Sequence, residues 1–192
     1  MAVERLIPER DAIILVDVQN DFCPGGALPV PEGHEVVPAL NGLIKRVRAL
    51  TVATRDWHPP NHCSFKPQGG PWPVHCVAGT AGAAFHPDLA TDRVAHVVSK
   101  PTRADEETYS GFQGTDLADL LWKGGIRRVF VGGLATDYCV KATALDAVKH
   151  GFETTVLEDA IRGVEVQPGD CARALEEMKR AGIRILRTED LA

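Results

Sequence analysis

Several apolar runs of the sequence lead directly to a side chain that could take part in catalysis. Such runs are typical of buried parallel strands, and open α/β sheets hold their active sites beyond the carboxyl ends of these strands. Three runs supply a carboxylate, an amine and a thiol: residues 12–16 lead to Asp17, residues 94–99 lead to Lys100, and residues 129–131 lead through two glycines to Cys139. The sequence therefore predicts these three groups at one edge of a sheet.

Cys139 is the candidate nucleophile, because it stands where a strand is expected to turn into a helix. Free backbone N–H groups at such a turn, together with a nearby cation, can lower the pKa of a thiol and favour the nucleophilic thiolate. The same N–H groups could hold an oxyanion. The alternative is a buried, inert cysteine, which is the usual state of a free thiol. The presence of Asp17 and Lys100 at the same edge favours the nucleophile.

A fourth run, residues 50–54, leads to Asp56 and His58. In extended backbone these two side chains point to the same side, because they are two residues apart. A third ligand from the following loop would complete an open three-ligand metal site. The candidates for it are His62, His75 and His86. Two imidazoles and a carboxylate suit zinc, iron or manganese better than calcium.

Two other interpretations of this histidine-rich segment remain open at this stage. The pairs His62-Cys63 and His75-Cys76 could form a closed structural zinc site, although their spacing fits no strong zinc motif. Alternatively, the loop binds no metal and Asp56 only forms a turn. The irregular stretch 57–87 is long for a compact domain, and this length favours a functional loop.

The elements that position these residues alternate between strands and helices. Helices are expected from the apolar stripe at 36–47, after a Thr115 N-cap, after Cys139 as far as Gly151, and around Leu175 and Met178. Strands are expected at 12–16, 50–55, 94–99, 128–133, 153–157 and 183–186. This alternation predicts an α/β fold, with one domain over residues 1–192 and a parallel sheet covered by helices on both faces.

Composition limits the classes of function. The net charge of −5, from 26 acidic and 21 basic residues, argues against a nucleic-acid-binding or membrane-binding surface. The charged start lacks the apolar core of a signal peptide, and no stretch approaches the roughly 18 apolar residues of a membrane span. Five cysteines form an odd number without framework spacing, so we expect free thiols in a reducing, cytoplasmic compartment.

Five segments of the chain resemble the nicotinamidase/pyrazinamidase branch of the isochorismatase-like cysteine hydrolases. They are Asp-Val-Gln-Asn-Asp-Phe at 17–22, Arg-Asp-Trp-His-Pro at 55–59, Gly-Pro-Trp-Pro-Val-His-Cys at 70–76, Ser-Lys at 99–100 and Gly-Leu-Ala-Thr-Asp-Tyr-Cys at 133–139. The order Asp, Lys, Cys alone indicates the superfamily. The Asp-x-His and Trp-Pro-x-His patterns together indicate its metal-containing nicotinamidases.

The resemblance implies a six-stranded sheet of order 3-2-1-4-5-6 and a catalytic triad of Asp17, Lys100 and Cys139. In that order strands one and four are neighbours, whereas strand three lies two strand spacings, roughly 10 Å, from strand one. Only a long side chain such as that of Lys100 could cross this gap. The implied metal ligands are Asp56, His58 and His75, with His62 as a secondary candidate and zinc as the first choice of ion.

The resemblance also implies how a substrate would be held. The backbone N–H groups of Ala135 and Cys139 would form the oxyanion hole, with a cis peptide before Ala135. Phe22 and Trp72 would flank a pyridine ring, and Leu134 and Tyr138 would also contact the substrate.

The implied reaction is the hydrolysis of nicotinamide to nicotinate and ammonia through a cysteine thioester, in NAD salvage, with pyrazinamide as a further substrate. One alternative is another carboxamide or N-carbamoyl amidohydrolase of the same superfamily. An isochorismatase is less expected, because the Asp-x-His pattern has no evident use in vinyl-ether hydrolysis. A catalytically inert binding module would fit the loss of a triad residue, and none is lost. The sequence leaves a homo-oligomer open.

Overall fold

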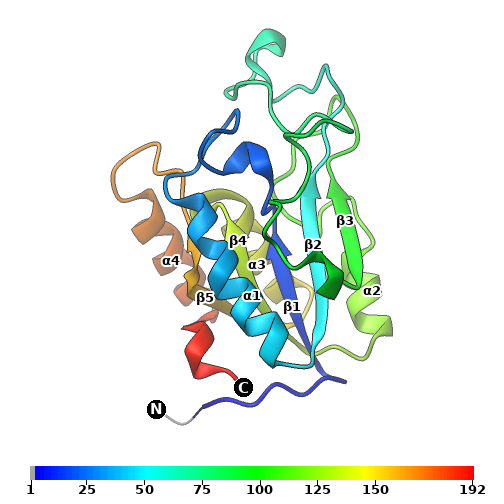
Figure 1. Ribbon diagram of the computed structural model, residues 1–192, viewed down its shortest axis with the longest axis vertical. Coiled ribbons are helices and arrows are strands. Elements are labelled where there is room, and N and C mark those ends of the chain that lie inside the picture. Colours follow the sequence, from blue (N-terminus) through cyan, green and yellow to red (C-terminus); the bar gives the residue numbers. More distant parts are fainter. Residues whose placement is uncertain (1–2) are drawn as a thin grey trace.

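The computed structural model describes residues 3–192, and its central feature is one six-stranded sheet (Figure 1). All neighbouring strands are parallel, and their order is β3-β2-β1-β4-β5-β6. The strands are β1 (Asp11–Val16), β2 (Leu50–Asp56), β3 (His96–Lys100), β4 (Arg128–Leu134), β5 (Glu153–Arg162) and β6 (Arg184–Leu186). The predicted α/β fold and strand order are thus confirmed.

Helices cover both faces of the sheet. They are α1 (Val36–Arg46), α2 (Leu117–Lys123), α3 (Lys141–Lys149) and α4 (Asp170–Arg180). Helix α1 packs in one hydrophobic cluster, whereas α2, α3 and α4 contribute to a second cluster. Figure 1 shows α1 in front of the sheet and α3 behind it.

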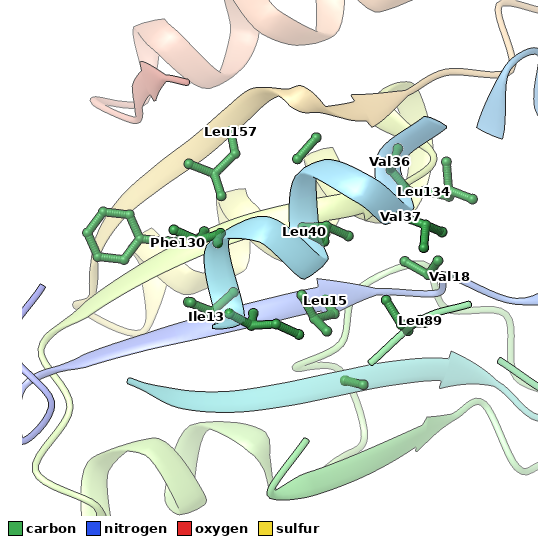
Figure 2. Close-up of a cluster of buried hydrophobic side chains, with 14 of the residues drawn as sticks. Ile13, Leu15, Val18, Val36, Val37, Leu40, Leu89, Phe130, Leu134 and Leu157 are labelled. Atoms are coloured by element: carbon green, nitrogen blue, oxygen red, sulfur yellow. The ribbon is translucent and has the colours of Figure 1, made fainter. Parts of the chain in front are cut away.

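The burial of strand β1 explains why its sequence is continuously apolar. Ile13 and Leu15 belong to the cluster under α1, where Figure 2 shows them facing Leu40. Ala12, Ile14 and Val16 belong to the cluster on the opposite face. A central parallel strand is buried on both faces, and therefore has no polar side to show in its sequence.

Two strands differ from their predicted bounds, and the other four agree within one residue. Strand β3 begins at His96 rather than Val94, because residues Thr91–Arg93 form a 3-10 turn closed by the Val94 N–H. Strand β5 continues to Arg162, well past residue 157. The register between β4 and β5 shifts after Val131, which pairs with Val156. The pairing continues at Gly133 with Ile161, and this irregularity lets β5 extend further.

The start of α2 also differs from its prediction. The helix begins at Leu117 and the residue at its N-cap position is Asp116, one residue after the predicted cap. Thr115 still caps locally, since its hydroxyl accepts the Leu117 N–H at 3.3 Å.

The segment between β2 and β3 lies beyond the carboxyl ends of the strands (Figure 1). It contains the histidine-rich loop and therefore sits above the edge where the active side chains were expected. No helix within residues 3–192 is long and apolar enough to cross a bilayer.

Candidate active site

The ends of three strands bring together Asp17, Lys100 and Cys139, which we call the thiol cluster. Lys100 is the last residue of β3, and its Nζ lies 2.8 Å from Asp17 Oδ2 and 3.6 Å from Cys139 Sγ. The lysine side chain crosses the end of β2 to reach the end of β1, as its length allows. All three residues are at most 6% exposed, so their interactions are little screened by solvent.

Asp17 takes its position through an unusual backbone conformation. Its φ of 48° lies in the left-handed region, which ends strand β1. Oδ1 accepts a hydrogen bond of 2.6 Å from the Thr54 hydroxyl, and Oδ2 is the oxygen beside Lys100. Within the described residues no aligned hydrogen-bond donor reaches Oδ2. This oxygen is therefore the one able to take a proton from the thiol.

Cys139 lies in a π-helical turn, Thr136–Val140, between β4 and α3. The peptide bond between Leu134 and Ala135 is cis, as the resemblance implied. Gly133 has a φ of 126°, and a Cβ there would stand 2.1 Å from the Val16 carbonyl oxygen. Only glycine allows β4 to approach β1 so closely, and this approach brings the turn with Cys139 beside Asp17.

Burial and the neighbouring charges decide the protonation states of this cluster. Burial opposes the charge of Lys100, but the carboxylates of Asp17 and Asp56 outweigh it and raise the pKa of Lys100 well above its usual value. Burial also raises the pKa of Asp17, although Lys100 counteracts it. The Cys139 thiol likewise has a raised pKa, because burial outweighs the attraction of Lys100.

Lys100 lowers the thiol pKa, as expected from the sequence, but burial acts in the opposite direction and has the larger effect in the ligand-free site. A raised pKa favours the protonated thiol, and the Asp17 carboxylate lies close enough to accept its proton. In such an arrangement the thiolate can form by proton transfer during the attack on the substrate, and it need not be present beforehand.

Asp56, His58 and His75 form a second group, which we call the metal cluster. Asp56 Oδ2 lies 3.3 Å from His58 Nε2 and 3.9 Å from His75 Nε2. One ligand atom from each residue lies within 4.8 Å of the others. The second oxygen of Asp56 is 2.7 Å from Lys100 Nζ, so this carboxylate joins the two clusters.

Unpartnered atoms in the metal cluster show that its residues fit a bound cation. Within the part of the chain that the structure describes, both ring nitrogens of His58 are buried without a hydrogen-bond partner. Buried polar atoms are rarely left so, because losing water without gaining a partner is costly. His75 Nδ1 bonds the Pro73 carbonyl at 2.8 Å, which leaves Nε2 facing Asp56. The donor set fits a transition-metal ion.

The structure separates the third-ligand candidates. Both nitrogens of His62 are engaged, with Ser64 Oγ at 2.7 Å and the Glu106 carbonyl oxygen at 2.9 Å. Its ring packs on that of His58, with centroids 4.1 Å apart, so it supports the cluster from outside. His86 accepts the Asp88 N–H on the outer surface.

The alternative His-Cys zinc site is wrong. Among residues 3–192 the groups able to hold a metal are the metal cluster and the set Asp17, Asp56 and Cys139, and neither includes Cys63 or Cys76. Cys76 is instead buried in the hydrophobic cluster of α1. In the second set Lys100 already supplies the positive charge.

One pocket opens onto both clusters. Cys139 lines it together with all three members of the metal cluster. Of the predicted substrate contacts, Phe22, Trp72 and Tyr138 line the pocket, as does Ala135 of the predicted oxyanion hole. Leu134 is fully buried in the core under α1 and is not among the lining residues.

Sequence reasoning missed several walls of this pocket. Tyr109 accepts a 3.1 Å hydrogen bond from Trp72 Nε1 and so orients that ring. Glu107 places a carboxylate in the lining, and burial raises its pKa. Their closeness to Lys100 in the sequence was the available signal. Three further apolar residues of the lining lie in irregular segments, where the sequence pattern gives no indication of their role: Leu28, Val30 and Val164. The mostly apolar and aromatic walls of the pocket suit a flat, largely apolar ring.

Comparison with known proteins agrees with this geometry. The chain is 41% identical to the nicotinamidase of Escherichia coli (strain K12), and the alignment covers 96% of this chain and 97% of the other. The crystal structure of the pyrazinamidase of Pyrococcus horikoshii in complex with zinc is 56% identical, with a TM-score of 0.87 over 93% of this chain and 99% of that one. The structure of PnC1 from L. infantum in complex with nicotinate is 40% identical, with a TM-score of 0.95 over 100% and 99%.

A family model gives the same result over nearly the whole sequence. Residues 11–190 match the isochorismatase domain, and this range contains both clusters and every wall of the pocket. The protein belongs to the isochorismatase family, in the branch that includes nicotinamidases and pyrazinamidases.

Proposed function

We propose that the protein is a nicotinamidase, which hydrolyses nicotinamide to nicotinate and ammonia in NAD salvage and also accepts pyrazinamide. The observation that carries this proposal is that Cys139 and the metal cluster line the same pocket. A thiol cluster alone would serve many amides. A metal cluster beside it adds a way to recognise a ring nitrogen, and the relatives named above bind or hydrolyse such rings.

The thiol cluster would carry the covalent chemistry. As Cys139 Sγ attacks the carboxamide carbon, its proton passes to Asp17 Oδ2, while Lys100 stabilises the developing thiolate. The oxyanion would be held by the backbone N–H groups of Ala135 and Cys139. Asp17 then gives its proton to the departing ammonia. A water molecule, deprotonated by Asp17, opens the thioester to give nicotinate, and the proton returns to Cys139.

Asp56, His58 and His75 would hold one divalent ion, with zinc as the first choice and iron or manganese as alternatives. When bound, the ion supplies a Lewis acid that favours a substrate whose ring nitrogen faces it, directly or through water. Phe22 and Trp72 would hold the two faces of the ring, and Tyr138 would close the pocket beside Cys139.

The composition and the free thiols support a cytoplasmic location and a small-molecule partner. All five cysteines are free, which agrees with a reducing cytoplasm. The net charge of −5 argues against nucleic acid or a membrane as partner, so nicotinamide would be the main binding partner.

Ammonia release is the direct test. We expect the purified protein to release ammonia from nicotinamide and pyrazinamide, to lose this activity with a chelator and to regain it with zinc. Turnover of N-carbamoyl substrates without turnover of nicotinamide would instead establish the other amidohydrolase. Binding of nicotinamide without any release would establish an inert binding module.

A further inference from the structure

The ladder between β1 and β2 ends before the metal cluster begins. Its last register pair is Val16 with Thr54, and the left-handed turn at Asp17 then takes the chain away from the sheet. The Asp17 N–H still reaches the Thr54 carbonyl oxygen at 3.2 Å. In a parallel sheet alternate residues of a strand face the same neighbour, so Asp56 turns its N–H and C=O toward the place that β1 has left.

The side chain of Gln19 occupies that place. Its Oε1 accepts the Asp56 N–H at 2.7 Å, and its Nε2 donates to the Asp56 carbonyl oxygen at 2.8 Å. The second Nε2 hydrogen reaches the Ala83 carbonyl oxygen at 2.9 Å. Gln19 is fully buried, and both polar atoms of its amide are paired.

The chemistry of the amide explains why glutamine stands here. A carboxamide offers one acceptor and one donor side by side, as a peptide group does, so it can continue the ladder by one rung. Glutamate would present a second acceptor to the Asp56 carbonyl oxygen, and methionine would leave both main-chain groups buried without partners. Asparagine is one methylene shorter and could not span the same gap.

The residue held in this way is Asp56, which links the two clusters. Oδ1 of Asp56 accepts a hydrogen bond from Lys100, and its Oδ2 faces His58 and His75. A movement of its main chain would therefore shift a metal ligand and the amine of the thiol cluster together. Positions of this kind tolerate displacements of only a fraction of an ångström.

We propose that Gln19 is a positioning residue, whose side-chain amide fixes the Asp56 main chain and so aligns the metal cluster with the thiol cluster. The inference rests on the proposed function for its effect on turnover. Its effect on metal binding does not depend on which substrate the enzyme uses.

The test compares Gln19→Met with a matched control at Asn41. The amide of Asn41 bridges a loop in the same manner, donating to the Asp88 carbonyl oxygen at 2.7 Å and accepting the Ala90 N–H at 2.8 Å, but Asn41 does not line the pocket of the two clusters. Zinc affinity of the folded protein is measured by competition with a chromogenic chelator, and kcat and KM are measured with saturating zinc. Thermal unfolding is followed with and without zinc.

For Gln19→Met we expect zinc affinity to fall about 10- to 100-fold, as for the loss of other outer-shell partners, and kcat to fall at saturating zinc. Asn41→Ala should lower thermal stability but leave zinc affinity and kcat within about twofold of the parent. If Gln19→Met does not fold, Gln19→Asn should show the same loss of zinc affinity and kcat, because its shorter amide cannot span the gap.

Unchanged zinc affinity and kcat in the Gln19 variant that folds would overturn the inference, as would an equal loss in Asn41→Ala. Failure of the proposed function looks different. In that case the parent protein releases no ammonia from nicotinamide, while Gln19→Met still binds zinc more weakly than the parent.

Discussion

The thiol cluster and the metal cluster share one carboxylate, yet they differ in how their charges are compensated. In the thiol cluster Lys100 lies 2.8 Å from Asp17 and 2.7 Å from Asp56, so opposite charges meet inside the protein. In the metal cluster both nitrogens of His58 lack a partner among the described residues. The charges of the first cluster compensate one another within the chain, whereas the donor atoms of the second suit a cation. Substitutions should therefore affect turnover, stability and metal content separately.

The largest effect is expected from Cys139→Ala. Without the nucleophile, ammonia release from nicotinamide should fall on the order of 10⁴-fold or more. Zinc content should stay at the parent level, because Cys139 is no member of the metal cluster. Ammonia assays and elemental analysis of the same preparation check both parts. Near-normal turnover would remove Cys139 from its proposed role.

Lys100→Met should affect stability as well as activity. It leaves the buried carboxylates of Asp17 and Asp56 facing each other without a cation, which costs about 3–5 kcal/mol when a buried pair is broken. Urea unfolding of the metal-free protein measures this loss. The double variant with Asp17→Asn should recover part of it. A loss under about 1 kcal/mol, as for an exposed pair, would mean that the charges are not balanced as described.

His58→Ala should act on metal content instead. We expect zinc affinity to fall by more than the roughly 10- to 100-fold that loss of an outer-shell partner costs. His62→Gln is the matched control: it should keep zinc but lower thermal stability, since His62 joins Ser64 to Glu106. If both variants lost zinc equally, His62 would have to be counted as a ligand.

The smallest effect concerns the acid side of the pH profile. Burial raises the pKa of Asp17, so this carboxylate takes up a proton at a higher pH than an exposed aspartate does. A protonated Asp17 cannot accept the thiol proton, and kcat/KM should fall with decreasing pH at an apparent pKa above the usual range of aspartate. Zinc is kept saturating, and its content is measured at each pH. An acid limb that follows zinc loss alone would contradict this origin.

The sequence was most informative where burial leaves a simple pattern. The runs that became β1 and β4 are apolar on both faces, and the side chains that follow them necessarily reach the same edge of a parallel sheet. Fold class and the arrival of Asp17, Lys100 and Cys139 at one edge could thus be predicted, whereas the strand order was implied by the family resemblance.

The remaining features depend on the course of irregular backbone. Hydrophobic spacing does not determine how the loop after β2 folds, so it could not choose between His62, His75 and His86. The irregularity that extends β5 and the arrival of Val164 at the pocket come from pairing and turns distant in sequence. Leu134 points into the core under α1, because it is the last residue of β4 and lies on the same side of that strand as Phe130.

The close approach of Gly133 to Val16 has a consequence for the mutational tolerance of this enzyme. Any side chain at Gly133 would push β4 away from β1, and with it the turn that carries Cys139. A saturation library should therefore reject every substitution at this position, although glycine itself offers no reactive group. Apolar walls such as Val164 should accept residues of similar size and change substrate range instead. Positions that reject every substitution in such a library would thus include residues that set the spacing between strands, in addition to the catalytic residues.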